Sequence, residues 1–96
     1  MTIPKSVKIG GKRYKVCVSK TNEMYTLGEI DYDKRVINIY TKTKARKIPK
    51  SEQQVVFWHE VVHGILEEIK PKLSKDEQFV QGMAEHLVDV FKSARF

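Results

Sequence analysis

The sequence predicts an α+β domain in which a small antiparallel sheet precedes two helices, for three reasons. Apolar and polar residues alternate through the first forty positions, as they do in half-buried strands. Two later segments carry apolar residues at helical spacing, and Pro49 and Pro71 interrupt the chain before and between them. The chain of 96 residues has the length of one small domain, so residues 1–96 are expected to form a single unit.

The first part of the chain is expected to form three or four strands. Residues 7–18 have the pattern of two strands around Gly10-Gly11, a pair typical of a hairpin turn. Residues 27–30 and 36–40 have the pattern of two further strands, joined by a turn at residues 31–34. If the strand at residues 36–40 has a free edge, an extended peptide could bind there as an additional strand.

The second part of the chain is expected to form two helices. The first is predicted to begin at Ser51, which with Gln54 fits a capping box, and to end before Pro71. The second is predicted to begin at Ser74, which pairs in the same way with Glu77. Under this interpretation Glu77 has a structural role at the start of the second helix.

Composition narrows the class of protein. Eighteen Lys and Arg against twelve Asp and Glu give a formal net charge of +6. A solvated basic surface explains this charge, and contact with nucleic acid or an acidic partner is the alternative. Cys17 is the single cysteine, which excludes an internal disulfide and is typical of a reducing compartment. The sequence shows neither a signal-peptide core nor a stretch of membrane-span length, so a cytoplasmic protein without membrane contact is expected.

The segment His59-Glu60-Val61-Val62-His63 indicates a zinc-binding, catalytic site. Histidines four residues apart on a helix point the same way, one turn apart, so both can bind one Zn²⁺ ion. Glu60 lies about 100° around the helix from His59, off the ligand face. There its carboxylate can act as a general base on a water molecule that the metal activates. The segment therefore predicts His59 and His63 as zinc ligands and Glu60 as the catalytic base.

Zinc needs a third protein ligand, and the second helix is the expected donor. Its polar candidates are Glu77, Gln81, Glu85 and His86. Glu77 is assigned to the helix cap, and Gln81 is a neutral amide. We favour Glu85, because Asp89 follows one turn later and can accept the second N–H of a ligating imidazole. The helical phase places Gln81 nearer to the buried side, so the third ligand stays open among these four residues.

Residues 59–63 (HEVVH), followed by the later segment AEHLVDVF, resemble the gluzincin arrangement of thermolysin-like metallopeptidases. In that group a Glu ligand is followed four residues later by an Asp, which implies Glu85 as ligand and Asp89 behind a ligating histidine. The chain is also similar to minimal gluzincins and to small ImmA/IrrE-like metallopeptidases of phages and mobile elements. In the latter, a hairpin such as LGEIDYDKRVINIY precedes the motif helix. The resemblance covers about residues 27 to 92 and implies a regulatory protease.

The expected function is zinc-dependent hydrolysis of peptide bonds in a protein or peptide substrate. The alternative from another class is a non-catalytic module, stabilised by zinc, that binds nucleic acid or a protein partner. The two differ in what they require of Glu60, since only a peptidase needs its carboxylate. The substrate and the oligomeric state are left open by the sequence.

Overall fold

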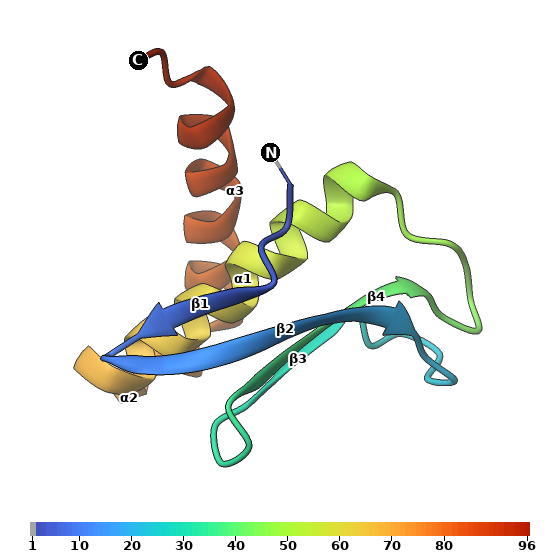
Figure 1. The fold of residues 1–96 in the computed structure, drawn as a ribbon, viewed down its shortest axis with the longest axis horizontal. Helices are drawn as coiled ribbons and strands as arrows, with labels where there is room; N and C mark the ends of the chain where they lie inside the picture. The colour runs from blue at the N-terminus through green and yellow to red at the C-terminus, as the bar shows by residue number, and fades with distance from the viewer. Residues whose placement is uncertain (1) are drawn as a thin grey trace.

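Four strands are followed by three helices in a computed structural model that describes residues 2–96 (Figure 1). The predicted α+β class, with a small sheet before the helices, is confirmed. The short helix α2 was not expected from the sequence. The elements are β1 (Ser6–Ile9), β2 (Lys12–Lys20), β3 (Gly28–Asp31), β4 (Val36–Lys42), α1 (Lys50–Ile69), α2 (Pro71–Ser74) and α3 (Glu77–Ser93).

The sheet has the strand order β1-β2-β4-β3 and is mixed rather than wholly antiparallel. β1 pairs with β2, and β3 with β4, in antiparallel hairpins, whereas β2 and β4 run parallel. The second hairpin joins the first through β4, whose Ile37 and Ile39 are completely buried. β3 carries Glu29 and Asp31, which suit an edge strand because charged residues discourage unwanted pairing. β4 therefore has no free edge, and the prediction of one at residues 36–40 is wrong.

Both hairpin turns lie where the sequence predicts them. Gly10 and Gly11 join β1 to β2 with φ angles of 59° and 76°, which glycine adopts without strain. The second hairpin turns at residues 32–35, where the carboxylate of Asp31 accepts a hydrogen bond from the N–H of Lys34 at 2.9 Å. These turns fix the register of each hairpin and hence which strand residues face the core.

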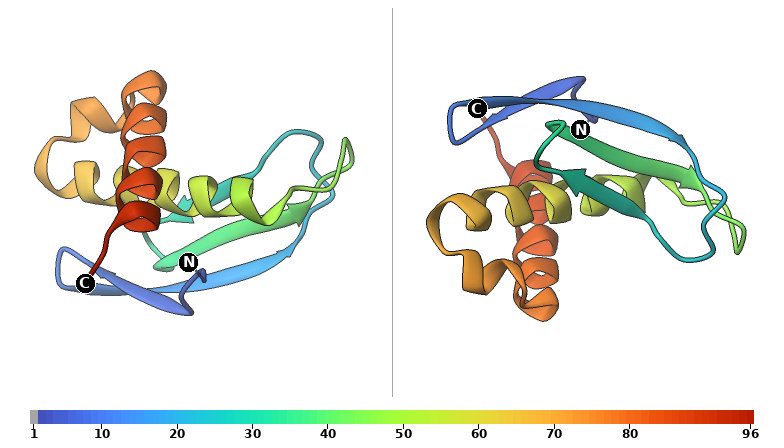
Figure 2. Two further views of the ribbon diagram at one scale, coloured as in Figure 1. Left: turned by 90° about the horizontal axis from the view of Figure 1, so that it is seen from above. Right: turned by 90° about the horizontal axis from the view of Figure 1, so that it is seen from below.

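All helices lie on one side of the sheet, and α1 is the helix that covers it (Figure 2). Alternate residues of the strands point toward α1 and form the main core with it. The opposite face of the sheet is left uncovered (Figure 2). The buried side chains of this core are Ile9, Tyr14, Val16, Ile37 and Ile39 from the strands, and Val56, Phe57 and Val61 from α1.

α1 has a second buried side, against which α3 packs. Val62 and Leu66 of α1 contact Val80 of α3 in a second core. Trp58 also stacks on Phe91, with ring centroids 4.9 Å apart. α3 crosses α1 steeply and packs against α1 and α2 rather than against the sheet (Figure 1). Although α1 has 20 residues, no helix within residues 2–96 combines the length and the apolar character needed to cross a membrane.

Neither of the predicted capping boxes is present. α1 begins one residue before Ser51, and no side chain caps its N-terminus. α3 is capped by Asp76, whose carboxylate accepts a hydrogen bond from the N–H of Phe79 at 3.1 Å. Ser74 instead ends α2, and its hydroxyl group bonds to α1. Glu77 is therefore not committed to a helix cap.

α1 approaches the edge of the sheet closely at Gly28 of β3. A β-carbon at this position would lie 2.6 Å from Cγ1 of Val56 and 3.0 Å from the backbone oxygen of Asn38. It would also lie 3.3 Å from the carboxylate of Glu60. Any larger residue would force α1 and β3 apart, so this glycine sets the distance between the motif helix and the edge strand.

Gly28→Ala is expected to lower the free energy of unfolding by about 1–3 kcal/mol, because the added methyl group overpacks the contact between α1 and β3. Gly82→Ala in α3 is the matched control, since no atom lies within 4 Å of its β-carbon position. Alanine is the better helix former, so this control should gain roughly 0.5–1 kcal/mol. Denaturant titration measures both changes. Equal or greater stability of Gly28→Ala would show that the close approach imposes no constraint.

Candidate metal centre

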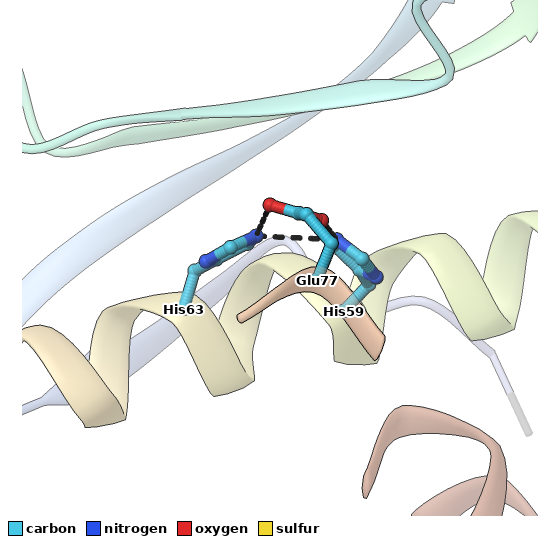
Figure 3. A group of neighbouring side chains, drawn as sticks. All are labelled: His59, His63 and Glu77. Atoms are coloured by element: carbon cyan, nitrogen blue, oxygen red, sulfur yellow. Dashed lines mark hydrogen bonds and ion pairs between the residues drawn. The ribbon is translucent and has the colours of Figure 1, made fainter. Parts of the chain in front are cut away.

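α1 presents two histidines one turn apart on one face, as their spacing predicts (Figure 3). The Nε2 atoms of His59 and His63 are 3.2 Å apart, and their ring centroids are 4.8 Å apart. Two nitrogens bound to one tetrahedral zinc ion at about 2.0–2.1 Å would lie roughly 3.3–3.4 Å from each other. The rings therefore already have nearly the separation that a shared zinc ion requires.

Glu77, the first residue of α3, completes the group from the neighbouring helix. Its Oε2 lies 3.0 Å from Nε2 of His59, and its Oε1 lies 3.1 Å from Nε2 of His63. The ligand atoms of the three residues all lie within 4.8 Å of one another, within reach of one metal ion. Figure 3 shows the carboxylate facing both ring nitrogens. His59, His63 and Glu77 are called the metal group below.

The outer nitrogen of each ring is held by a neighbouring side chain. Nδ1 of His59 lies 2.8 Å from Oε1 of Gln81, an oxygen that can only accept a hydrogen bond. Nδ1 of His63 lies 3.2 Å from Oγ of Ser74, which donates its own hydrogen to the His63 carbonyl at 3.3 Å. These partners favour the tautomer in which both Nδ1 atoms carry the proton. Both Nε2 atoms then direct a lone pair into the metal group.

In the metal group, the Nε2 lone pairs of His59 and His63 and the carboxylate of Glu77 thus point toward one another. Such an arrangement is repulsive until a proton or a cation lies between the atoms. Two imidazoles and one carboxylate form a donor set typical of catalytic zinc sites, in which the fourth position is left for water or substrate. The residues of the group therefore fit a zinc ion.

The structure does not bring Glu85, the predicted third ligand, to the histidines, and Glu77 lies there instead. Because α3 crosses α1 steeply, only its first turns reach the metal group (Figure 1). Glu85 lies about 12 Å farther along the helix than Glu77. Glu85 and Asp89 are exposed and line a separate surface pocket. Asp89 therefore does not support a histidine, and Gln81 and Ser74 do so instead.

The local sequence does contain a signal for Glu77, although the capping-box pattern assigns this residue to the helix start. Asp76 is also a favourable N-cap residue, and with Asp76 as cap the carboxylate of Glu77 is available for other contacts. Glu77 and Gln81 are then four residues apart on one face of the helix. His86, the remaining candidate, is exposed, and its Nδ1 lies 2.8 Å from the carbonyl oxygen of Gly82.

Glu60 lies on the sheet side of α1, outside the metal group, as its position in the motif predicts. The residue is 7% exposed. Burial raises the pKa of Glu60 to about 8, with a further contribution from the carboxylates of Glu77 and Glu29. Glu60 and His59 line one cavity of about 220 Å³ that extends to the edge strand β3. A buried carboxyl group with a raised pKa in a cleft is a property typical of catalytic residues.

In the metal-free protein, Glu60→Gln is expected to become increasingly more stable than wild type as the pH rises from about 4.5 to about 8. In this window the unfolded chain releases the carboxyl proton that the folded protein retains, so wild-type stability falls as the pH rises. The change in pKa limits the difference to about 5 kcal/mol. Denaturant titration of both proteins at pH 5 and pH 8, with a chelator present, measures this difference in the free energy of unfolding. If the stability of Glu60→Gln and that of wild type change equally with pH, the assignment is contradicted.

Comparison with known proteins gives no match, whether with protein-family models, with curated proteins or with solved structures. The chemistry of the metal group and of Glu60 is therefore the basis for assigning a function.

Proposed function

We propose that the protein is a zinc-dependent peptidase whose metal ion is held by His59, His63 and Glu77. One observation carries the proposal: two imidazole lone pairs and a carboxylate converge at about 3 Å. The contacts of Gln81 and Ser74 with the outer ring nitrogens support the proposal, because metal-binding histidines usually donate their other N–H to a neighbouring oxygen. Three ligands beside a cavity suit a catalytic zinc site, whereas structural sites are closed by four.

Glu60 is proposed as the general base of the reaction. A zinc ion in such a group supplies Lewis acidity, which polarises a carbonyl group and promotes the deprotonation of water. The carboxylate of Glu60 takes the proton of the attacking water and returns it to the amine that leaves. Its burial beside the cavity raises its affinity for a proton, which suits a group that accepts and releases one near neutral pH.

The free edge of β3 is proposed to bind the backbone of the substrate. β3 is an edge strand of the sheet, and Leu27 and Gly28 line the same cavity as His59 and Glu60. An extended peptide that pairs with β3 would therefore pass beside the general base. Val56 also lines this cavity, which favours an apolar substrate side chain there.

The proposal agrees with the resemblance to gluzincins and to ImmA/IrrE-like metallopeptidases. With Glu77 as the third ligand, the likeness depends on the HExxH motif at residues 59–63 and on the preceding hairpin, and not on Glu85 and Asp89. A regulatory protease of phage or mobile-element origin is the role that this resemblance implies. The free thiol of Cys17 supports a reducing compartment such as the cytoplasm.

A non-catalytic, zinc-stabilised binding module is the competing function. The same metal group would serve it equally well. In such a module the buried carboxyl group of Glu60 would have no role, and its burial would only lower the stability of the fold. The position of Glu60 beside the metal group therefore favours the peptidase.

Purified protein is expected to contain about one zinc ion per chain. His63→Ala and Glu77→Ala should each reduce the zinc content and the melting temperature, because metal binding also stabilises the fold. Glu85→Ala removes a carboxylate from the same helix outside the metal group and is the matched control, which should retain zinc. Gln81→Ala should weaken zinc binding by about 10–100-fold. Loss of zinc in Glu85→Ala but not in Glu77→Ala would contradict the assigned ligand set.

The zinc-loaded protein is expected to cleave members of a peptide library, with the products identified by mass spectrometry. Glu60→Gln should slow this cleavage by about 10²-fold or more while zinc is retained, because the amide cannot take up the proton of water. Glu85→Gln is the control and should cleave like wild type. Undiminished cleavage by Glu60→Gln would refute the peptidase mechanism.

A further inference from the structure

Charges are divided unevenly between the two layers of the molecule. Residues 2–50, which include the whole sheet and its loops, contain thirteen Lys and Arg but four Asp and Glu, an excess of nine positive charges. Residues 51–96, which include almost all helical positions, contain five Lys and Arg but eight Asp and Glu, an excess of three negative charges. The helices lie on one side of the sheet, and the other side is left uncovered (Figure 2).

Basic side chains lie opposite one another at both ends of the sheet. At one end, Lys8 of β1 lies opposite Arg13 of β2. At the other end, Lys42 of β4 pairs with Lys20 of β2 and with Lys47 in the following loop. All five residues are exposed. Like charges placed opposite each other destabilise a sheet, so the stability of the fold does not explain this arrangement.

β2 runs between the two basic ends, which are both exposed. Arg13 and Lys15 alternate with the buried residues Tyr14 and Val16, so they point away from α1. Nη1 of Arg13 donates a hydrogen bond to Oγ of Ser6 at 3.0 Å. The nine residues of β2 span about 30 Å, close to the length of one duplex turn of about 34 Å. The basic strip defined in this way consists of Lys8, Arg13, Lys15, Lys20, Lys42 and Lys47.

The protein itself does not neutralise the basic strip. Among the Lys and Arg of residues 2–96, the two that form ion pairs with a carboxylate are Lys12, with Glu68, and Arg46, with Glu52. Neither belongs to the strip. An external anion that binds along β2 would therefore replace repulsion between neighbouring cations by attraction.

We propose that the basic strip binds the phosphate backbone of nucleic acid, independently of the metal group. Exposed cations distributed along an extended strand suit a linear polyanion, and phosphate contacts of this kind do not depend on base sequence. An anionic membrane fits less well, because binding to lipid also requires apolar side chains beside the charges. Most large exposed apolar side chains belong to the helical layer: Ile65, Ile69, Phe79, Met83, Val90 and Phe91. Val18, Met24 and Tyr25 are also exposed, on β2 and in the loop that follows it.

Fluorescence anisotropy with a labelled DNA duplex of about 24 base pairs and arbitrary sequence tests the proposal. The full-length protein should bind it with an affinity that falls steeply with salt, at a logarithmic slope of roughly −3 to −5. Lys15→Glu combined with Lys42→Glu should lower the affinity at least about tenfold and reduce the slope by about 2. Lys72→Glu combined with Lys92→Glu is the matched control, because it makes the same change in net charge within the helical layer.

The control pair should bind the duplex nearly as tightly as wild type, and both double variants should remain folded, with a cooperative thermal unfolding transition. Equal loss of affinity in the two pairs would overturn the proposal, because net charge alone would then explain binding. Failure to bind the duplex at about 50 mM salt would overturn it too, as would tighter binding to phosphatidylserine vesicles than to DNA. Glu60→Gln should bind DNA like wild type, so this test is independent of the peptidase activity.

Discussion

The rest of the structure depends on one constraint: α1 must bury two of its sides at once. Phe57 and Val61 pack against the sheet, whereas Val62 and Leu66 pack against the neighbouring helices. Packing on both sides holds α1 in one orientation, so the half-buried residues between the two cores are held as well. The histidines at 59 and 63 are among these residues. Their positions are therefore fixed by packing, which is the preorganisation that the proposed metal centre needs.

The same packing brings together groups that repel one another unless a proton or a cation lies between them. The lone pairs of His59 and His63 face each other and the carboxylate of Glu77, and the carboxyl group of Glu60 is buried beside them. Each of these features lowers stability in the absence of a cation. A bound zinc ion would turn this repulsion into binding energy, which in a small domain also contributes to folding. Metal binding and stability are therefore expected to be closely coupled in this protein.

The two proposed activities use different surfaces. The metal group and the cavity beside Glu60 lie between α1, the start of α3 and the edge strand β3. The basic strip runs along β2, and its Arg13 and Lys15 lie on the face of the sheet that no helix covers. A peptide at the cavity and a polyanion on the strip would therefore not compete for the same residues. The acidic excess of the helical layer would also keep a polyanion away from the metal group.

The sequence by itself determined what depends on local geometry. Four-residue spacing on a helix puts His59 and His63 side by side, and the next position turns Glu60 toward the sheet. The two-glycine turn and the α+β class follow from equally local patterns. Only the tertiary structure decided that Glu77 rather than Glu85 reaches the histidines, that β2 and β4 run parallel, and that the pKa of Glu60 is raised. The physical reason is that these features arise from contacts between residues far apart in the chain. Such contacts make α3 cross α1 steeply, and they bury β4 in the centre of the sheet.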